Sequence, residues 1–124
     1  MAIETTRETS SLISADKVEG TKVYSAEGDH LGEIHEVMID KISGNVAYAV
    51  MSFGGFLGIG EKYHPLPWSA LDYDTDAGGY VVNLSRDQLE GGPTFDAGKT
   101  PRWGDRDYET RLHDYYGLPP YWMA

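Results

Sequence analysis

Four glycines and a lysine lie within residues 54–62, directly after the apolar run 46–53, where a phosphate-binding loop would be placed. A P-loop needs the pattern G-x-x-x-x-G-K-[ST], because its backbone amides surround the phosphates while the lysine and the hydroxyl reach the distal oxygens and Mg²⁺. Gly55 and Gly60 have the required separation, but Glu61 occupies the lysine position and would repel a phosphate. Two prolines follow too soon for a helix that could direct a positive dipole end at the ligand. The sequence therefore predicts no nucleotide site in this loop.

The same loop carries three apolar side chains, Phe56, Leu57 and Ile59, between its glycines. The glycines permit a sharp reversal between two strands, and the three hydrophobes would then lie at the tip of that reversal. Apolar side chains on a connecting loop are unusual in water and often mark contact sites. We therefore predict that Phe56, Leu57 and Ile59 contact a protein partner.

A series of carboxylates, Asp72, Asp74 and Asp76, has the spacing with which an EF-hand calcium loop begins. Ala77 stands where that loop requires glycine, and Asn83 stands where it requires the bidentate glutamate. Strand patterns rather than helical ones flank the series. Because Asp and Gly are also ordinary hairpin residues, we interpret this stretch as a turn.

The remaining candidates for chemistry are scattered. The four histidines, His30, His35, His64 and His113, form no helical i, i+4 pair and no short cluster, so a metal site would need ligands from distant segments. No serine lies in a G-x-S-x-G pattern, so a hydrolase nucleophile elbow is absent. We predict no catalytic residues, no cofactor and no metal, and hence a protein that is not an enzyme.

Composition limits the classes of partner and compartment. The chain has 124 residues, 40% of them hydrophobic, which suits one domain with a real core. Its formal net charge of -10 disfavours nucleic acid and anionic membranes. Cysteine is absent, and no apolar run approaches the ~20 residues that a membrane-spanning helix needs. We expect an acidic, bacterial-type cytoplasmic protein without membrane insertion.

The chain divides into three regions by composition. Residues 1–11 are rich in Thr, Glu and Ser, and we predict that they are disordered. Residues 12–92 alternate short apolar runs with turn signals, a pattern typical of an all-β unit. Residues 93–124 are aromatic-rich and interrupted by prolines, and we interpret them as a C-terminal extension with one short helix.

Six strands are predicted within the all-β unit. They cover residues 21–24, 33–40, 46–53, 62–67, 71–74 and 80–84. The fourth contains two prolines and is expected at an edge of the sheet, because proline cannot donate to a ladder. Ser85 and Gln88 have the spacing of a capping box and predict a short helix that ends at glycine.

Two of these strands carry further information. The apolar residues Ile34, Val37 and Ile39 break the period of two, and a β-bulge near His35 would place all three on one face. The strand at 46–53 is apolar on both faces and therefore needs a cover on each side. One cover is the core, and the other must come from the C-terminal extension or from a partner.

The C-terminal extension predicts a helix with Asp105 as its N-cap and Gly117 at its end. Tyr108, Leu112, Tyr115 and Tyr116 form one apolar stripe along that helix. Tyr121 and Trp122 follow a Pro-Pro spacer that would hold them extended, away from the helix and toward a neighbouring subunit. Together with Trp103, these side chains expose too much apolar area for water. They cover either the chain's own sheet or a partner, and we predict all seven as contact residues.

The sequence resembles the PRC-barrel family, which includes the cytoplasmic domain of the photosynthetic reaction-centre H subunit and the C-terminal half of a ribosome maturation factor. The resemblance covers residues 12–92 and rests on three motifs. These are the glycine pattern Gly20, Val23, Gly28, Leu31, Gly32, the strand end "MID" (38–40) and "PLPWSAL" (65–71). It implies a small, strongly bent β-barrel that serves as an adaptor or assembly surface without catalysis. The membrane helix of the H subunit and the N-terminal domain of the ribosome factor have no counterpart, so neither pathway carries over.

We therefore expect an all-β PRC-type barrel with a short helix after its last strand and a helical tail, acting through apolar loop and tail surfaces. A homodimer is expected, with the tail crossing or flanking its interface. The alternative is a small-ligand or metal-binding module whose site lies between barrel and tail; convergence of His64 with acidic residues would support it.

Overall fold

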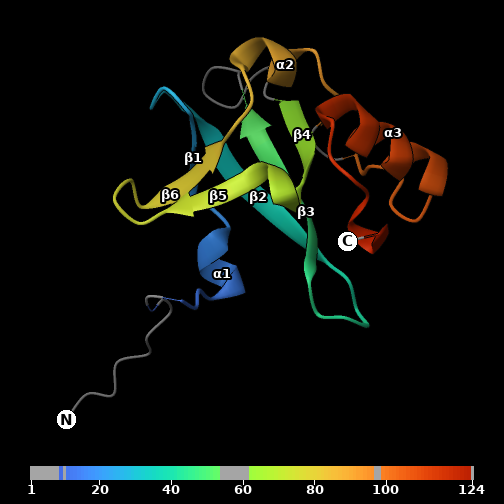
Figure 1. The fold of residues 1–124 in the computed structure, drawn as a ribbon, viewed down its shortest axis with the longest axis horizontal. Coiled ribbons are helices and arrows are strands. Elements are labelled where there is room, and N and C mark those ends of the chain that lie inside the picture. The colour runs from blue at the N-terminus through green and yellow to red at the C-terminus, as the bar shows by residue number, and fades with distance from the viewer. Residues whose placement is uncertain (1–8, 10, 54–61, 97–98, 124) are drawn as a thin grey trace.

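The computed structural model describes residues 9, 11–53, 62–96 and 99–123 (Figure 1). The helices are α1 (Ala15–Val18), α2 (Arg86–Glu90) and α3 (Arg106–Tyr116), with 3-10 turns η1 (Trp68–Ala70) and η2 (Tyr121–Met123). The strands are β1 (Lys22–Ser25), β2 (His30–Ile39), β3 (Val46–Phe53), β4 (Lys62–Pro67), β5 (Leu71–Asp74), β6 (Gly79–Val82) and β7 (Phe95–Asp96). All six predicted strands and both predicted helices are present, whereas α1 and β7 were not predicted.

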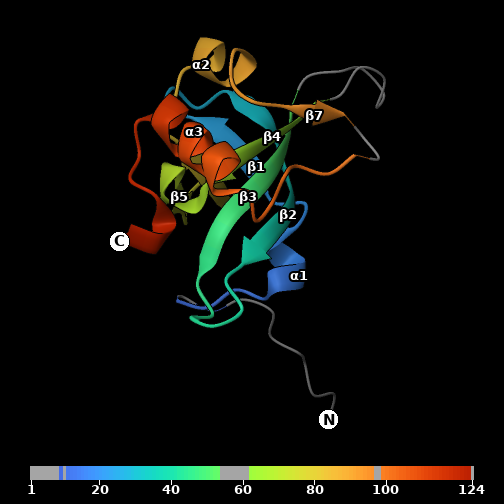
Figure 2. The ribbon, with the colours of Figure 1, turned by 90° about the vertical axis from the view of Figure 1, so that its right-hand side faces the viewer.

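The strands form one seven-stranded sheet in the order β5-β6-β1-β2-β3-β4-β7. Every pairing is antiparallel except that of β1 with β6, which is parallel. The sheet bends so that β5 and β6 lie across β2 and β3, as the two views show (Figures 1 and 2). In the described residues its end strands β5 and β7 do not pair, so the sheet is open. The prediction of a mainly β domain is confirmed, but among the described residues the sheet is not closed into a barrel.

The hydrophobic core lies inside this bend. Side chains from nearly every element contribute to it, among them Val23, Ile34, Met51, Leu66, Val82, Leu89 and Leu112. Trp68 is partly buried against the core and makes an edge contact with the Tyr80 ring. The core therefore includes both the sheet and the helices that follow it.

The bulge predicted near His35 is confirmed. Ile34 pairs with Met51 and Glu36 pairs with Val50, so His35 is the extra residue on β2. A second irregularity, between Met38 and Ile39, was not predicted. Beyond it the Ile39 side chain is 49% exposed, so the expectation that Ile39 shares the core face is wrong.

The predicted edge position of β4 needs a partial correction. Its first two residues, Lys62 and Tyr63, pair with β7, and a salt bridge of 2.6 Å joins Lys62 Nζ to Asp96 Oδ1. Its second half, where Pro65 and Pro67 cannot donate, pairs with β3 alone. Only this proline-containing half behaves as an edge among the described residues.

Helix α2 begins as the sequence predicts. The Ser85 hydroxyl accepts from Gln88 N at 3.1 Å, and the Gln88 side chain accepts from Ser85 N at 3.1 Å. The capping box satisfies two amides that the first turn leaves unpaired. Gly91 ends the helix, which places Leu89 in the core.

Gly32, one of the glycines in the pattern described above, is required where β2 passes close to β3. A Cβ at this position would lie 1.8 Å from the Ser52 carbonyl oxygen on β3, a distance that no contact tolerates. Because the obstacle is backbone, the two strands would have to separate to admit a side chain. Gly32 is thus required by the close approach of β2 to β3.

We predict that Gly32→Ala lowers the free energy of unfolding by about 3 kcal/mol, as overpacking against backbone does. Gly28→Ala is the matched control. Its added Cβ meets nothing within 4 Å, and only the positive φ of 92° opposes it, at a cost of about 1 kcal/mol. Urea denaturation of both variants measures the difference, and equal losses would contradict the proposed strand collision.

Candidate interaction site

The C-terminal segment packs on its own sheet and supplies the second cover that β3 needs. Helix α3 lies beside β4, and both views place it on the outer side of the β3–β4 pair (Figures 1 and 2). Asp105 caps the helix by accepting from Asp107 N and Tyr108 N, as predicted. All of β3 is buried or half-buried, including Val50 and Tyr48 on the face away from the core strands β5 and β6. The sequence left open whether the C-terminal extension or a partner covers the second face of β3. In the structure the chain's own C-terminal extension covers it.

The chain reverses after α3 instead of extending away from it. Gly117 adopts the left-handed conformation, Gly117 N donates to the Asp114 carbonyl, and Leu118 N donates to the His113 carbonyl at 3.0 Å. This is a Schellman motif, which turns the chain back along the helix. The expectation that Tyr121 and Trp122 are held away from the helix is therefore wrong.

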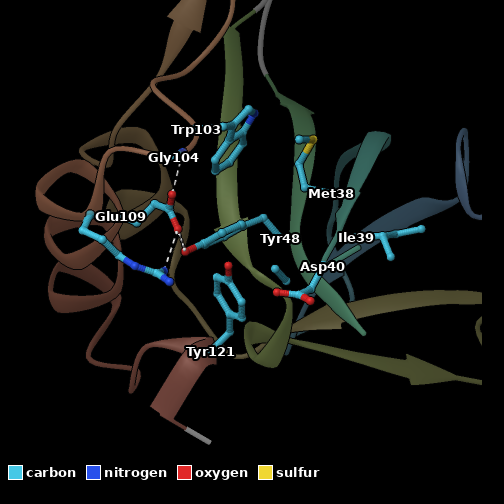
Figure 3. Close-up of a pocket in the computed structure, with 10 residues that line it drawn as sticks. Met38, Ile39, Asp40, Tyr48, Trp103, Gly104, Glu109 and Tyr121 are labelled. Carbon is cyan, nitrogen blue, oxygen red and sulfur yellow. Dashed lines mark hydrogen bonds and ion pairs between the residues drawn. The ribbon is translucent and has the colours of Figure 1, made fainter. Parts of the chain in front are cut away.

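Tyr48 of β3 is the residue on which the tail converges. Its ring is stacked on Trp103 at a centroid distance of 4.8 Å and meets the edge of Tyr121 at 5.4 Å. Figure 3 shows Trp103 and Tyr121 on opposite sides of Tyr48. Aromatic pairs in these geometries add about 0.5–1.5 kcal/mol each beyond the burial of area. Tyr48 is itself only 2% exposed.

A buried polar group lies directly beneath these rings. The Tyr48 hydroxyl donates to Glu109 Oε1 at 3.0 Å and lies 2.9 Å from His113 Nε2. Glu109 Oε2 accepts from Gly104 N at 2.8 Å (Figure 3). Glu109 is 5% exposed and His113 is fully buried. The group links β3, the turn before α3 and two successive turns of α3, so it fixes the position of the helix on the sheet.

The electrostatics of this group favour a structural role. Burial raises the pKa of Tyr48 strongly, and the Glu109 carboxylate raises it further. Burial lowers the pKa of His113, against the opposing effect of Glu109. At neutral pH the Tyr48 hydroxyl therefore stays protonated and the His113 imidazole stays neutral, so hydrogen bonds hold the group together. The group is suited to holding the tail.

Arg106 extends the contact outward to Trp122. Its guanidinium lies 3.7 Å from the centroid of the Trp122 ring, and its Nη1 is 3.5 Å from Glu109 Oε1. The guanidinium thus stacks on an aromatic face while it partly balances the buried carboxylate.

A cavity of about 240 Å³ opens beside Tyr48, between the end of β2 and the tail. Its walls include the aromatic rings of Tyr48, Trp103 and Tyr121, together with the charged side chains of Asp40, Glu109 and Arg106. Figure 3 shows the Asp40 carboxylate directed toward Tyr48 and Tyr121. We call this the tail cavity.

A second, larger hollow adjoins it and is mainly apolar. Its volume is about 660 Å³, and it lies between the β2–β3 turn, η1 and the end of the chain. We call it the hairpin–tail groove, and its apolar walls are Ile42, Val46, Trp68, Leu118, Pro119 and Trp122. Ile42 on its rim is 99% exposed.

The ten predicted contact residues have different fates. Phe56, Leu57 and Ile59 lie outside the described residues. Leu112 and Tyr116 are buried in the core, so they stabilise the fold and are not free for a partner. Three of the others are half-buried and line the two hollows: Trp103, Tyr121 and Trp122. Tyr108 is half-buried against the Trp103 ring. Tyr115 is 42% exposed, and its hydroxyl donates to the Gln88 carbonyl at 2.7 Å.

The sequence reading missed the polar members of the site. Glu109 was not singled out in the sequence, and His113 appeared only as one of four scattered histidines. Their spacing of four residues on the predicted helix places both on one face. That face also carries the buried residues Leu112 and Tyr116. Two polar side chains at the centre of an apolar helix face indicate that each has a buried hydrogen-bond partner, and this was the signal in the sequence.

His64 does not converge with acidic residues. It is 2% exposed, contacts the Phe53 ring edge-on at 5.3 Å, and has a pKa lowered by burial. Among the described residues, no three His, Cys, Asp or Glu side chains lie close enough to hold a metal ion. The condition that would have favoured a metal module is not met in that part of the chain.

Comparison with known proteins agrees with this architecture, that of a small β-rich domain whose bent sheet is covered by its own tail. The profile of the PRC-barrel domain matches residues 11–89, which is more than half of the sequence. The chain belongs to the PRC-barrel family, as its glycine pattern and "PLPWSAL" motif predicted. The tail that covers Tyr48 lies outside the matched range.

A relative of unassigned function was also found. The chain is 25% identical over 71 residues to an uncharacterized protein of Deinococcus radiodurans. The match spans 57% of this chain and about a quarter of the relative's length. No helix in the described residues is long and apolar enough to cross a bilayer.

We predict that Tyr48→Phe lowers the free energy of unfolding by about 2 kcal/mol, because it leaves the buried Glu109 and His113 without their shared partner. Tyr24→Phe, on the half-buried ring of β1, is the control and should change stability by less than about 0.5 kcal/mol. Urea denaturation followed by far-UV circular dichroism measures both. A loss for Tyr48→Phe no larger than the control's would show that the polar group does not hold the tail.

A second prediction concerns pH. Because burial lowers the pKa of His113 and of His64, the unfolded chain takes up protons below about pH 6.5 before the folded protein does. Stability is therefore complete above pH 6.5 and falls as the pH decreases toward 5, by at most about 2.7 kcal/mol per pH unit for two histidines. His113→Gln and His64→Gln should each remove about half of that slope. Denaturation at pH 7, 6 and 5 tests this, and a slope that neither variant changes would contradict it.

Proposed function

We propose that this protein is a non-catalytic interaction module, an adaptor that works by binding another protein through apolar surfaces built from the PRC-type sheet and its tail. The observation that carries the proposal is the hairpin–tail groove. A hollow of about 660 Å³ with mainly apolar walls and a wholly exposed isoleucine on its rim is costly in water unless a partner covers it. Membership of the PRC-barrel family supports a general protein-interaction role.

The chemistry of the site supports the non-catalytic part of the proposal. The titratable side chains of Tyr48, Glu109 and His113 meet in one buried group, and we infer that they fix α3 on β3. Catalysis would need a nucleophile or a general base within reach of a substrate. The described residues therefore support a role in protein contact better than a role in catalysis.

A cytoplasmic homodimer belongs to the same proposal. The tail packs on its own sheet, so a second copy would meet its outer surface, at the hairpin–tail groove or at the exposed residues Ile42 and Met123. The apolar loop residues Phe56, Leu57 and Ile59 remain predicted contacts of this adaptor.

A second candidate function is a small-ligand module with its site between sheet and tail. The observation that favours it is the tail cavity, where three aromatic rings and three charged side chains meet in about 240 Å³. Ligand pockets combine apolar walls with a few polar groups in this way.

The adaptor proposal is tested by affinity capture from the source organism together with light scattering. Ile42→Ser changes a side chain that is 99% exposed, so it should leave the fold intact and abolish capture of the partner. Leu12→Ser, 73% exposed on the N-terminal segment, is the matched control and should retain capture. A protein that captures no specific partner would refute the adaptor. Light scattering should give twice the 13.7 kDa chain mass, and a constant monomer mass at high concentration would refute the dimer.

A further inference from the structure

The tail cavity has the walls of a site for a planar cation. Tyr48 and Trp103 present stacked rings, with an interplanar angle of 28°, and Tyr121 stands nearly perpendicular to Tyr48 at 86°. Tyr121 and Trp103 are half-buried, so parts of both rings remain accessible from the cavity. A cation within about 6 Å of such rings is attracted to their electron-rich faces.

Asp40 supplies a negative charge that, among the described residues, has no cation within ion-pair distance. Its Oδ1 accepts from Ile42 N at 3.0 Å and from Ser43 N at 2.8 Å, and these two bonds lower its pKa, so the carboxyl is ionised at neutral pH. In the described part of the chain the carboxylate has no ion pair within 4 Å, although the Ser43 side chain and, more weakly, the charge of Arg106 also lower its pKa. The acceptor is fixed in place by its own turn and directed at the aromatic walls (Figure 3).

Arg106 is the one positive charge among the described residues of the cavity wall, and its contacts already occupy it. Its guanidinium lies on Trp122 and beside Glu109, the carboxylate that also accepts from Tyr48 and Gly104. The two carboxylates of Glu109 and Asp40 exceed the single positive charge of Arg106, so the described cavity wall carries a net negative charge. The same arrangement shows that the tail's aromatic faces accept a guanidinium.

From this geometry we propose that the tail cavity binds an arginine side chain of the protein partner, with the guanidinium against the accessible parts of the aromatic wall at Trp103 and Tyr121 and its N–H groups donating to Asp40. Arginine fits better than lysine because its planar, weakly hydrated head stacks on aromatic rings and donates several hydrogen bonds in one plane. Arginine is also enriched at the energetic centres of interfaces. The overall charge of -10 favours a partner with a basic contact surface. This inference rests on the proposed adaptor function and names the anchor of its partner.

The test uses N-acetyl-arginine amide as a probe and N-acetyl-citrulline amide as its neutral isostere, titrated into the full chain. The signals to follow in ¹H–¹⁵N spectra are the Trp103 indole N–H and the Gly104 amide. We expect saturable shifts with arginine in the millimolar range and binding of citrulline at least fivefold weaker. Equal binding of the two probes, or no shift at Trp103, would overturn the proposal.

Asp40→Asn is the decisive variant, because the asparagine oxygen can still accept from Ile42 and Ser43 while the charge is lost. It should weaken arginine binding about fivefold, whereas Asp29→Asn, the same charge change in the exposed β1–β2 turn, should leave it unchanged. Tyr121→Leu, which removes one wall, is the second variant and should weaken binding similarly. Undiminished binding in Asp40→Asn or Tyr121→Leu would overturn the assignment.

The partner experiment separates this inference from the proposed function. Capture of the same specific partner equally well by wild type and Asp40→Asn would overturn the arginine anchor and leave the adaptor standing. Capture that is lost in Asp40→Asn and retained in Asp29→Asn supports the anchor. If the wild-type protein captures no partner, the adaptor proposal is refuted. The proposal that the bound arginine belongs to a protein partner is then refuted as well.

Discussion

The contact of Tyr48 with Glu109 and His113 is the constraint on which the rest of this structure depends. A strand with two apolar faces cannot be stable with one of them in water, and the tail covers the second face of β3. Apolar burial alone would let α3 slide along the sheet, since it has no direction. The buried hydroxyl, carboxylate and imidazole have direction, and each is costly to leave unpaired, so together they select one position for the helix.

Both hollows on this side of the molecule exist because of that position. The tail cavity lies between Tyr48 and the turn at Trp103 and Gly104, and Glu109 holds this turn by accepting from Gly104 N. The hairpin–tail groove exists because the Schellman motif at Gly117 returns the chain to the β2–β3 turn. The interaction surfaces are therefore consequences of how the tail is anchored.

Local features of the fold could be predicted from the sequence because local chemistry decides them. The strand at residues 46–53, the bulge at His35, the capping box at Ser85 and the helix from Asp105 to Gly117 each depend on neighbours within a few residues. The two-residue strand β7 and the turn of α1 are too short to leave a periodic pattern. Ile39 was misplaced because the second irregularity in β2 has no turn residue to indicate it.

The site was harder to predict because its members meet only through tertiary contacts, with Tyr48 and Glu109 61 residues apart in the chain. The aromatic residues of the tail were identified correctly as needing cover, yet burial divides them into core residues such as Tyr116 and cavity walls such as Tyr121. The sequence indicates how much apolar side-chain area the tail carries, but not which of these side chains enter the core and which line a cavity. Asp40 illustrates the same limit: in the sequence it is only the acidic end of a predicted strand. It becomes a candidate ligand only because the returning tail places aromatic rings in front of its carboxylate.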